Sequence, residues 1–375
     1  EITRFALWRS LRDPYGREWQ NGNSRWDLLD VTRAYRALRP AGVEWPVRED
    51  GFSSFRLEDL TAANGIEHGA AHDAMADVVA TIEIAKLLRR CDENLFDTLH
   101  RQRTKRAVSA LVNLDELTPL VHVSGMFGGA RHNLALVVPV AWHPTNNSDL
   151  ICVDLGKSPD FLEQPTDIVR QYLFTPQAEL PEGVERPPIK TIRLNRAPVL
   201  LPTQWVAGGV AESLGLDGDL HRRHLSLLRE ARAADQAGFM TRFQSLWQAQ
   251  SFPERSDPDQ LLYNGFVSDG DRSLCERAIA EDPTALGGQS FPFTDPRLPE
   301  MLFRYRARNF PHTLSDAEAA QWREHCQLQW QEGSFSLTQF EAELAQERAR
   351  PEVTENTLTA LNQLEEWVRA LSVEG

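Results

Sequence analysis

The strand-forming runs of this chain are confined to one stretch in its middle, and this limits the possible folds more than any other feature. Four short runs rich in β-branched and aromatic residues are separated by Gly, Asn and Pro, and they lie at 117–123, 135–142, 150–155 and 189–194. Such runs are typical of a small barrel. We therefore predict a β-barrel here, with helical sequence on both sides.

The first 90 residues have an α/β pattern in which helices alternate with Gly- and Pro-containing turns. The pattern predicts helices over 1–11, 28–38, 55–64 and 74–90, with Pro40 ending the second. In the last of these helices, apolar residues recur at three- and four-residue spacing and predict a buried face formed by Met75, Val78, Val79, Ile82 and Ala85.

Beyond Pro202 the chain becomes helical in pattern. Apolar periodicity predicts helices over 220–232 and 238–248, and a Pro/Asp/Ser stretch at 251–259 marks a boundary. Ser315-Asp-Ala-Glu318 is a capping box, and 337–372 predicts two long amphipathic helices. A chain of 375 residues is expected to hold two or three domains, and the changes of pattern place them at 1–91, 92–250 and 251–375.

Composition narrows the class of protein. No apolar run is long enough to span a membrane and no leader resembles a secretion signal, so we expect a cytoplasmic protein. The four cysteines are far apart without CxxC spacing, which predicts reduced thiols rather than a zinc site. Nothing in the sequence indicates an obligate oligomer, so a monomer is expected.

The charge of the chain is unevenly distributed. A net charge of −14 argues against a protein that coats nucleic acid indiscriminately. Nevertheless, residues 1–40 hold eight arginines against five acidic residues, and 101–132 hold five basic against two acidic residues. Each basic patch is a candidate contact for phosphates; the alternative is a solvated helix face.

His72 and Asp77 are the most informative residues for chemistry. Asp73 is a good N-cap, so Asp77 is expected early in the helix over 74–90 and His72 just outside it. A carboxylate there, with others, can hold a divalent ion, and an imidazole can take a proton from water. The alternative is a capping Asp and a surface His before an ordinary helix.

A second candidate site combines arginine with aromatic residues in the same α/β segment. Arg56 can contact a phosphate, and Tyr15, Trp19 and Trp26 can offer aromatic faces to unpaired bases. The alternative, which pattern alone favours, is that Trp26 and Phe55 belong to the core while Arg56 forms a local salt bridge.

Two further segments combine chain flexibility or aromatic residues with basic charge. The run 119–129 ends in Gly-Gly beside Arg131 and His132, where glycines can let the backbone approach a phosphodiester. A simple hairpin turn is the alternative. The basic and aromatic cluster 304–311 is equally compatible with helix packing.

Together, seven ordered segments of the chain resemble the bacterial exonuclease I family. They are Ser24–Asp30, Ser54–Leu57, Asn64–His68, Ala71–Val78, Pro119–Gly128, Leu262–Phe266 and Tyr305–Pro311. The resemblance runs from residue 1 to near the C-terminus. It implies a multidomain α+β fold: part of a ribonuclease-H-like DEDDh exonuclease domain, an SH3-like β-barrel with a helical extension, and an α-helical C-terminal domain that closes a groove around single-stranded DNA.

The same resemblance implies an activity and a partner. The implied reaction is 3′→5′ hydrolysis of single-stranded DNA to 5′-mononucleotides by two Mg²⁺ ions, with Mn²⁺ as a possible substitute, in DNA repair and recombination. The implied partner is the C-terminal tail of single-stranded-DNA-binding protein (SSB).

The resemblance also assigns roles to individual residues. His72 looks like the catalytic histidine, Asp77 like the last metal-binding aspartate, and Arg56 like the arginine that contacts substrate near the scissile end. The residues that fall where family members contact the DNA strand are Arg4, Tyr15, Trp19, Arg33 and Lys105. Arg39 corresponds to the tail-binding patch, but Thr98 and Thr118 replace the aromatic and basic residues expected there.

The chain departs from the family at its front. The strand bearing an Asp-x-Glu pair and the aspartate of the second motif have no counterpart, so Asp77 is one of four acidic ligands. We expect an N-terminally truncated exonuclease I, inactive as written, lacking roughly a hundred residues of an α/β domain. The alternatives are a non-catalytic module that binds single strands or the SSB tail, and a scaffold that never meets DNA.

Overall fold

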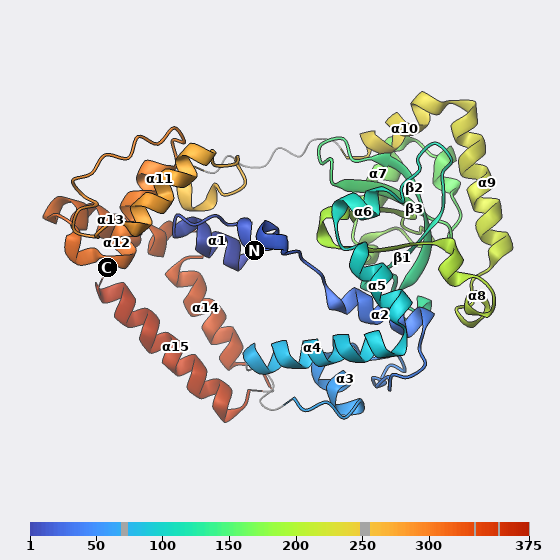
Figure 1. Ribbon diagram of the computed structural model, residues 1–375, viewed down its shortest axis with the longest axis horizontal. Coiled ribbons are helices and arrows are strands. Elements are labelled where there is room, and N and C mark those ends of the chain that lie inside the picture. Colours follow the sequence, from blue (N-terminus) through green and yellow to red (C-terminus); the bar gives the residue numbers. More distant parts are fainter. Residues whose placement is uncertain (69–73, 248–255, 334, 352, 375) are drawn as a thin grey trace. The chain divides into compact units, whose positions relative to one another are not determined.

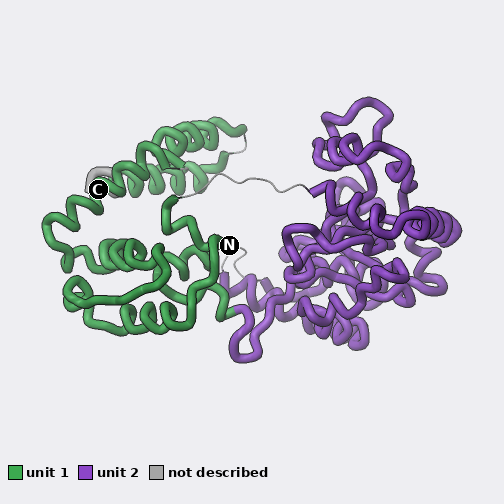
Figure 2. The backbone as a smooth tube through the Cα atoms, turned by 90° about the horizontal axis from the view of Figure 1, so that it is seen from above, with its two compact units in different colours: residues 1–17, 253–375 green, residues 18–252 purple. Residues whose placement is uncertain are grey.

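The chain forms two compact units in a computed structural model that describes residues 1–68, 74–247, 256–333, 335–351 and 353–374 (Figure 1). Figure 2 colours them separately: unit 1 comprises Glu1–Arg17 and Pro253–Gly375, and unit 2 comprises Glu18–Phe252. The described helices include none that is both long and apolar enough to cross a membrane.

Unit 2 is built on a five-stranded antiparallel sheet. Its strands, in the order β4-β3-β2-β1-β5, are β1 (Leu120–Val123), β2 (Leu134–Trp142), β3 (Asp149–Asp154), β4 (Ile189–Arg193) and β5 (Val199–Pro202). The four predicted runs are confirmed as β1 to β4. Strand β5 was missed because Pro198 precedes it and Pro202 ends it, so its sequence reads as part of a loop. Within the described strands, β4 and β5 each pair with one neighbour, so the ladder itself is not closed.

Both faces of this sheet are covered, which explains why the strands read as continuous apolar runs rather than alternating ones. All six residues of β3 are buried. Val121 and Leu201 pack into a core with α2 (Leu28–Leu38), while Ile151 and Val153 pack into another with α9 and α10. Figure 1 shows α9 (Gly218–Ala234) and α10 (Gln236–Ser245) beside the strands. The helices predicted over 220–232 and 238–248 are thus confirmed.

Further helices complete unit 2. They are α3 (Leu57–Ala63), α4 (Ala74–Cys91), α5 (Glu93–Arg101), α6 (Lys105–Ser109), α7 (Thr166–Phe174) and α8 (Gly209–Ser213). Several helices of unit 2 have an N-cap side chain. Asp27 accepts a hydrogen bond from the Leu29 amide at the start of α2, and Asp92 accepts one from the Leu95 amide at the start of α5. The helices predicted over 28–38, 55–64 and 74–90 are confirmed.

The buried face predicted for α4 is wrong. Met75, Val78, Val79 and Ile82 are all exposed, and Ala85 is only half-buried. The helix instead buries Ala80, Ile84 and Leu88, which repeat every four residues. Helix α4 is apolar on two sides, and periodicity cannot tell which of two apolar stripes meets the core. Contacts with α2, α3 and α5 decide that question.

Unit 1 is helical. Its elements are α1 (Ile2–Arg9), α11 (Asp269–Ala280), α12 (Leu298–Asn309), α13 (Asp316–Glu332), α14 (Leu337–Arg348) and α15 (Glu355–Glu374). Trp8 of α1 is buried with Cys275 of α11 and Met301 of α12. The capping box at Ser315 and Glu318 is confirmed by both of its hydrogen bonds. Helices α14 and α15 confirm the two predicted over 337–372.

Candidate functional site

The start of α4 holds a carboxylate in a defined orientation. Asp77 lies in the first turn of the helix, and its Oδ1 accepts a hydrogen bond of 2.8 Å from Nε2 of His68. The side chain of His68 is only 7% exposed, and its Nδ1 lies 3.4 Å from the Thr61 hydroxyl of α3. The side chain of Asp77 is 44% exposed. The buried imidazole therefore fixes the orientation of the Asp77 carboxylate, part of which remains exposed to solvent.

A complete metal site is not found among the residues that the structure describes. They contain no group of three or more His, Cys, Asp or Glu side chains that could hold an ion. His72, the predicted catalytic histidine, lies outside the described residues. A two-ion centre needs several carboxylates to hold the ions and offset their charge. Asp77 alone does not fit one, so we derive no reaction step through a metal.

Arg56 is an available cation close to this segment in sequence. It is the N-cap residue of α3 and is exposed, and its guanidinium makes no hydrogen bond or ion pair with the other described residues. Its amide lies 3.4 Å from the hydroxyl of Ser54, which in turn donates to Asp59. The local salt bridge considered as the alternative for Arg56 is absent from the described part of the chain.

Arg33 connects α2 to the loop that follows β1. Its Nη1 donates to Asp30 at 2.6 Å, and the guanidinium lies over the ring of Phe55 at 5.7 Å. A Cβ atom on Gly125 would come within 2.9 Å of this guanidinium. A side chain at 125 would therefore require the Arg33 guanidinium to shift. Phe55 is half-buried, and Trp26 packs edge-on against Phe96, so both aromatic residues serve the fold.

The glycine-rich segment 124–133 joins β1 to β2 through two short 3₁₀ turns, Gly125–Phe127 and Gly129–Arg131. It is longer than the hairpin turn considered as the alternative. Gly128 has a φ of +76°, which side chains rarely adopt, and nothing lies within 4 Å of where its Cβ would be. Gly129 packs against Phe52. Of these three glycines, Gly128 alone offers open space to a ligand.

Basic side chains surround Phe127 in this segment. Nζ of Lys190 lies 4.4 Å from the ring centroid, and the Arg131 guanidinium lies 5.3 Å from it. Arg131 also forms a two-pronged ion pair with Asp154, at 2.5 and 2.9 Å, which raises its pKa. Such planar pairs fix an arginine in one orientation.

Burial changes the titration of two groups here. It lowers the pKa of Lys190 from 10.5 to about 8, against the opposing effect of Asp30, and its Nζ has no hydrogen-bond partner among the described residues. Burial also lowers the pKa of His122 to about 3, so this histidine is neutral at pH 7. Its Nδ1 then donates to the Val199 carbonyl at 2.9 Å, which is a structural role.

The other predicted DNA contacts of unit 2 differ in availability. Trp19 is 60% exposed. Lys105 is half-buried, and its Nζ donates to the Ser148 hydroxyl at 2.9 Å. Arg39, assigned to the partner patch, pairs with Asp92 at 2.9 Å and lies over the ring of Trp205.

Two predicted DNA contacts belong to unit 1. The Arg4 guanidinium lies 5.1 Å from the ring centroid of Tyr15, and this ring meets Phe266 edge-on. Phe266 is 87% exposed. Arg4 and Tyr15 are thus brought together by the fold, on a surface that also presents an aromatic ring.

The cluster 304–311 proves to be structural. Arg304 is buried and contacts Asp257, Asp259 and Glu300, while Arg306 pairs with Glu318. The helix-packing alternative is therefore favoured for these arginines.

Sequence reasoning missed two residues of the site. His68 stands in one of the seven resembling segments, yet no spacing rule connects it with Asp77, because the contact spans a loop between α3 and α4. Lys190 lies in β4, whose sequence Ile-Lys-Thr-Ile-Arg gives no sign that this lysine is enclosed while Arg193 is exposed.

Two domain models of the exonuclease I family match this chain. Residues 103–245 match the exonuclease I SH3-like domain, and residues 256–371 match the exonuclease I C-terminal domain. Exodeoxyribonuclease I of Escherichia coli is 44% identical over 329 residues, which is 87% of this chain and 68% of that protein. Exodeoxyribonuclease I of Haemophilus influenzae is 40% identical over 92% of this chain and 72% of its own length.

Solved structures agree. Exonuclease I from Methylocaldum szegediense matches with a TM-score of 0.89 and 39% identity, covering 99% of this chain and 78% of its own. E. coli exonuclease I in complex with a dA16 oligonucleotide matches with a TM-score of 0.88 and 38% identity, covering 98% and 77%. The chain therefore belongs to the exodeoxyribonuclease I family.

Proposed function

We propose that this chain serves the 3′→5′ degradation of single-stranded DNA to 5′-mononucleotides, in the cytoplasm and in DNA repair and recombination. The family membership supports the enzyme class, and the oligonucleotide bound to the E. coli relative supports the substrate. The observation that carries the proposal is the oriented carboxylate of Asp77, held by His68 at 2.8 Å at the start of α4.

We propose that the activity depends on a divalent cation, Mg²⁺ first and Mn²⁺ as the alternative. A divalent ion would supply charge stabilisation at the phosphate. Asp77 is the ligand that the described residues offer for it. The role of His72 as the base stays a prediction, since this residue lies outside the described residues.

We assign the substrate contacts by how exposed each side chain is and whether it is already paired within the fold. Arg56 is exposed and unpaired within the described residues, so it can bind a phosphate without first breaking an ion pair. Trp19 can stack on a base, because most of its ring is exposed. Arg33 and Lys105 are partly engaged within the fold, and we assign them to phosphates along the strand. Arg4 and Tyr15 are assigned to the strand in unit 1.

The test is a nuclease assay that compares the protein as it occurs naturally with variants at Asp77 and His72. A 5′-labelled single strand is incubated with Mg²⁺, and the shortened strands and released mononucleotides are followed in time. Asp77→Asn and His72→Ala are each expected to slow release on the order of a hundredfold. Asp97→Asn, which changes an exposed carboxylate of α5, is the matched control and should leave the rate unchanged.

The outcomes separate the proposal from its alternative. Release that persists at the full rate in Asp77→Asn would remove this carboxylate from the reaction. Tight binding of the strand with no release, with or without Mg²⁺, would favour a non-catalytic binding module. The absence of a metal-binding cluster from the described residues is the observation that keeps this second function open.

We further propose that Arg39 takes part in binding the C-terminal tail of SSB. One solved relative is a complex of SSB and exonuclease I with an inhibitor. The guanidinium of Arg39 is 36% exposed and lies 5.4 Å from the ring centroid of Trp205, so part of it is open to a carboxylate ligand. Thr98 and Thr118 offer neither an aromatic ring nor a positive charge beside it.

A further inference from the structure

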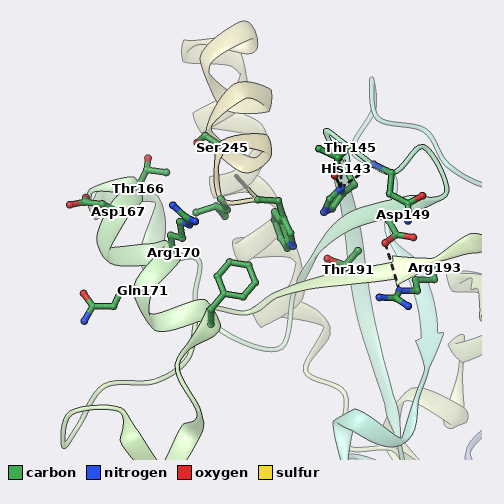
Figure 3. A pocket seen from close by; sticks show the side chains of 14 residues that line it. His143, Thr145, Asp149, Thr166, Asp167, Arg170, Gln171, Thr191, Arg193 and Ser245 are labelled. Carbon is green, nitrogen blue, oxygen red and sulfur yellow. Dashed lines mark hydrogen bonds and ion pairs between the residues drawn. The ribbon is translucent and has the colours of Figure 1, made fainter. Parts of the chain in front are cut away.

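A cavity of about 1090 Å³ opens in unit 2 between α7, the end of α10 and the strands β3 and β4. Figure 3 shows its two walls, with Thr166 and Arg170 of α7 on one side and His143, Asp149 and Arg193 on the other. Its size is that of a site for a small organic ligand. None of the residues assigned above to DNA, metal or the SSB tail lines it.

One part of the cavity is an aromatic surface. The ring of Trp247 meets the rings of His143 and Phe174 edge-on, with centroids 5.6 and 5.9 Å apart. Phe174 is 52% exposed, although it follows directly on the buried Leu173. Exposed aromatic rings grouped in a cavity are suited to stacking against a flat, polar ring system.

Two arginines provide positive charge at this surface. Arg170 is half-buried and makes no hydrogen bond or ion pair with the residues that the structure describes. Among the described residues, Arg193 pairs with Asp149 alone, through Nε and at the long distance of 3.7 Å, which leaves its two terminal nitrogens available. Asp167 and Gln171 of α7 also line the cavity (Figure 3), so one carboxylate lies on the same helix as Arg170. The cavity thus presents two guanidinium groups to an anion such as a phosphate.

Asp149 lies beside Arg193 at the same wall of the cavity. Its side chain is 8% exposed, and its Oδ2 lies 3.7 Å from Nε of Arg193. Its Oδ1 is enclosed by protein atoms and has no hydrogen-bond partner among the described residues, so a ligand in the cavity does not contact this oxygen.

We propose that this cavity binds a nucleotide. The base stacks on the Trp247 and Phe174 surface, and the phosphate is bound by Arg170 and Arg193. The choice of a nucleotide rests on the proposed function, whose product and substrate both contain one. The nucleotide is either free or one unit of a strand.

Calorimetric titration of the full chain with dAMP, without metal, tests this proposal. We expect saturable binding of dAMP that is about tenfold tighter than binding of inorganic phosphate, because only dAMP carries a base that can stack on the aromatic surface. Arg170→Gln and Phe174→Leu should each weaken dAMP binding about tenfold, by loss of a charged contact and of stacking. Arg223→Gln, an exposed arginine of α9 outside the cavity, is the matched control and should bind as the unchanged protein does.

The outcomes are distinct from those of the nuclease assay, since neither metal nor cleavage is involved. Equal binding of dAMP and inorganic phosphate would overturn the proposal, and so would dAMP binding that Arg170→Gln leaves unchanged. Displacement of dAMP by a deoxyadenosine oligonucleotide, with the same sensitivity to Arg170→Gln, assigns the site to a strand. Failure of the oligonucleotide to displace it assigns the site to the free nucleotide.

Discussion

At the scale of single residues, the positive charge of Lys190 opposes folding. Its Nζ is enclosed beside Phe127 without a hydrogen-bond partner among the described residues, and burial lowers its pKa to about 8. A lysine whose pKa is lower in the folded than in the unfolded state destabilises the fold wherever both states are protonated.

The variant Lys190→Met is expected to increase the free energy of unfolding by about 1 to 3 kcal/mol at pH 7, since it removes a buried charge and keeps the aliphatic chain. Below pH 8 the lysine is protonated in both the folded and the unfolded protein, so the full gain in free energy of unfolding is expected. Between pH 8 and 10.5 the folded state loses its proton first, and the gain declines as pH rises. Urea unfolding at pH 7 and pH 10 measures the difference. A variant less stable at both pH values would show that the contact with Phe127 outweighs the cost of burial.

At the scale of elements, α4 has two apolar sides, and only one of them packs into the core. Ile84 is 3% exposed, in a cluster with Leu88 and the strands β1 and β5, whereas Val78 and Ile82 are about half exposed. A row of exposed apolar residues along one helix face is unusual in a soluble protein. Here it ends next to Asp77, the most informative carboxylate of the chain.

The two faces of α4 should respond differently to substitution. Ile84→Ala is expected to lower the free energy of unfolding by about 2 to 4 kcal/mol, because it leaves a cavity in the core. The double variant Val78→Gln with Ile82→Gln should change it by less than about 0.5 kcal/mol. Chemical denaturation of both proteins, followed by circular dichroism, gives the comparison. A large loss in the double variant would mean that the exposed stripe is covered in solution.

At the scale of the whole molecule, an acidic protein is proposed to bind a polyanion. The net charge is −14, so binding depends on local groups such as Arg56 and Lys105 rather than on the overall field. These groups displace counterions from the strand, and the affinity therefore falls as salt rises.

Single-strand binding, measured by fluorescence anisotropy at several chloride concentrations, should give a linear log–log plot. The slope is expected to decrease by about 0.7 in Arg56→Gln, since one phosphate contact is lost. Arg223→Gln again serves as the control and should keep the original slope. An unchanged slope in Arg56→Gln would place this arginine away from the phosphates.

Much of the fold was predictable because it rests on local patterns. Helix α2 begins at the side chain of Asp27 and ends before Pro40, and α13 begins at a capping box, so their bounds are written in short segments. Strands β1 to β4 were recognisable as apolar runs between turn residues. Strand β5 begins after one proline and ends at another, so it was not distinguished in this way, and it is a strand because β1 pairs with it along its whole length.

The candidate site was only partly predictable, because its geometry is non-local. The likeness of seven segments pointed to Asp77 and Arg56, and both are available to a ligand in the structure. The hydrogen bond from His68 to Asp77 joins residues across a loop, and the packing of Arg33 against Gly125 joins α2 to the segment after β1. No periodicity or capping rule encodes such contacts.

The sequence by itself determined strands β1 to β4, several of the helices and the family, since each depends on neighbouring residues or on ordered motifs. Only the tertiary structure decided which side of α4 is buried, which arginines are engaged in ion pairs and which remain available, and that Lys190 and Asp149 carry buried atoms with no partner among the described residues. The physical reason is that burial and pairing depend on what surrounds a residue in space, and residues distant in the chain provide those surroundings.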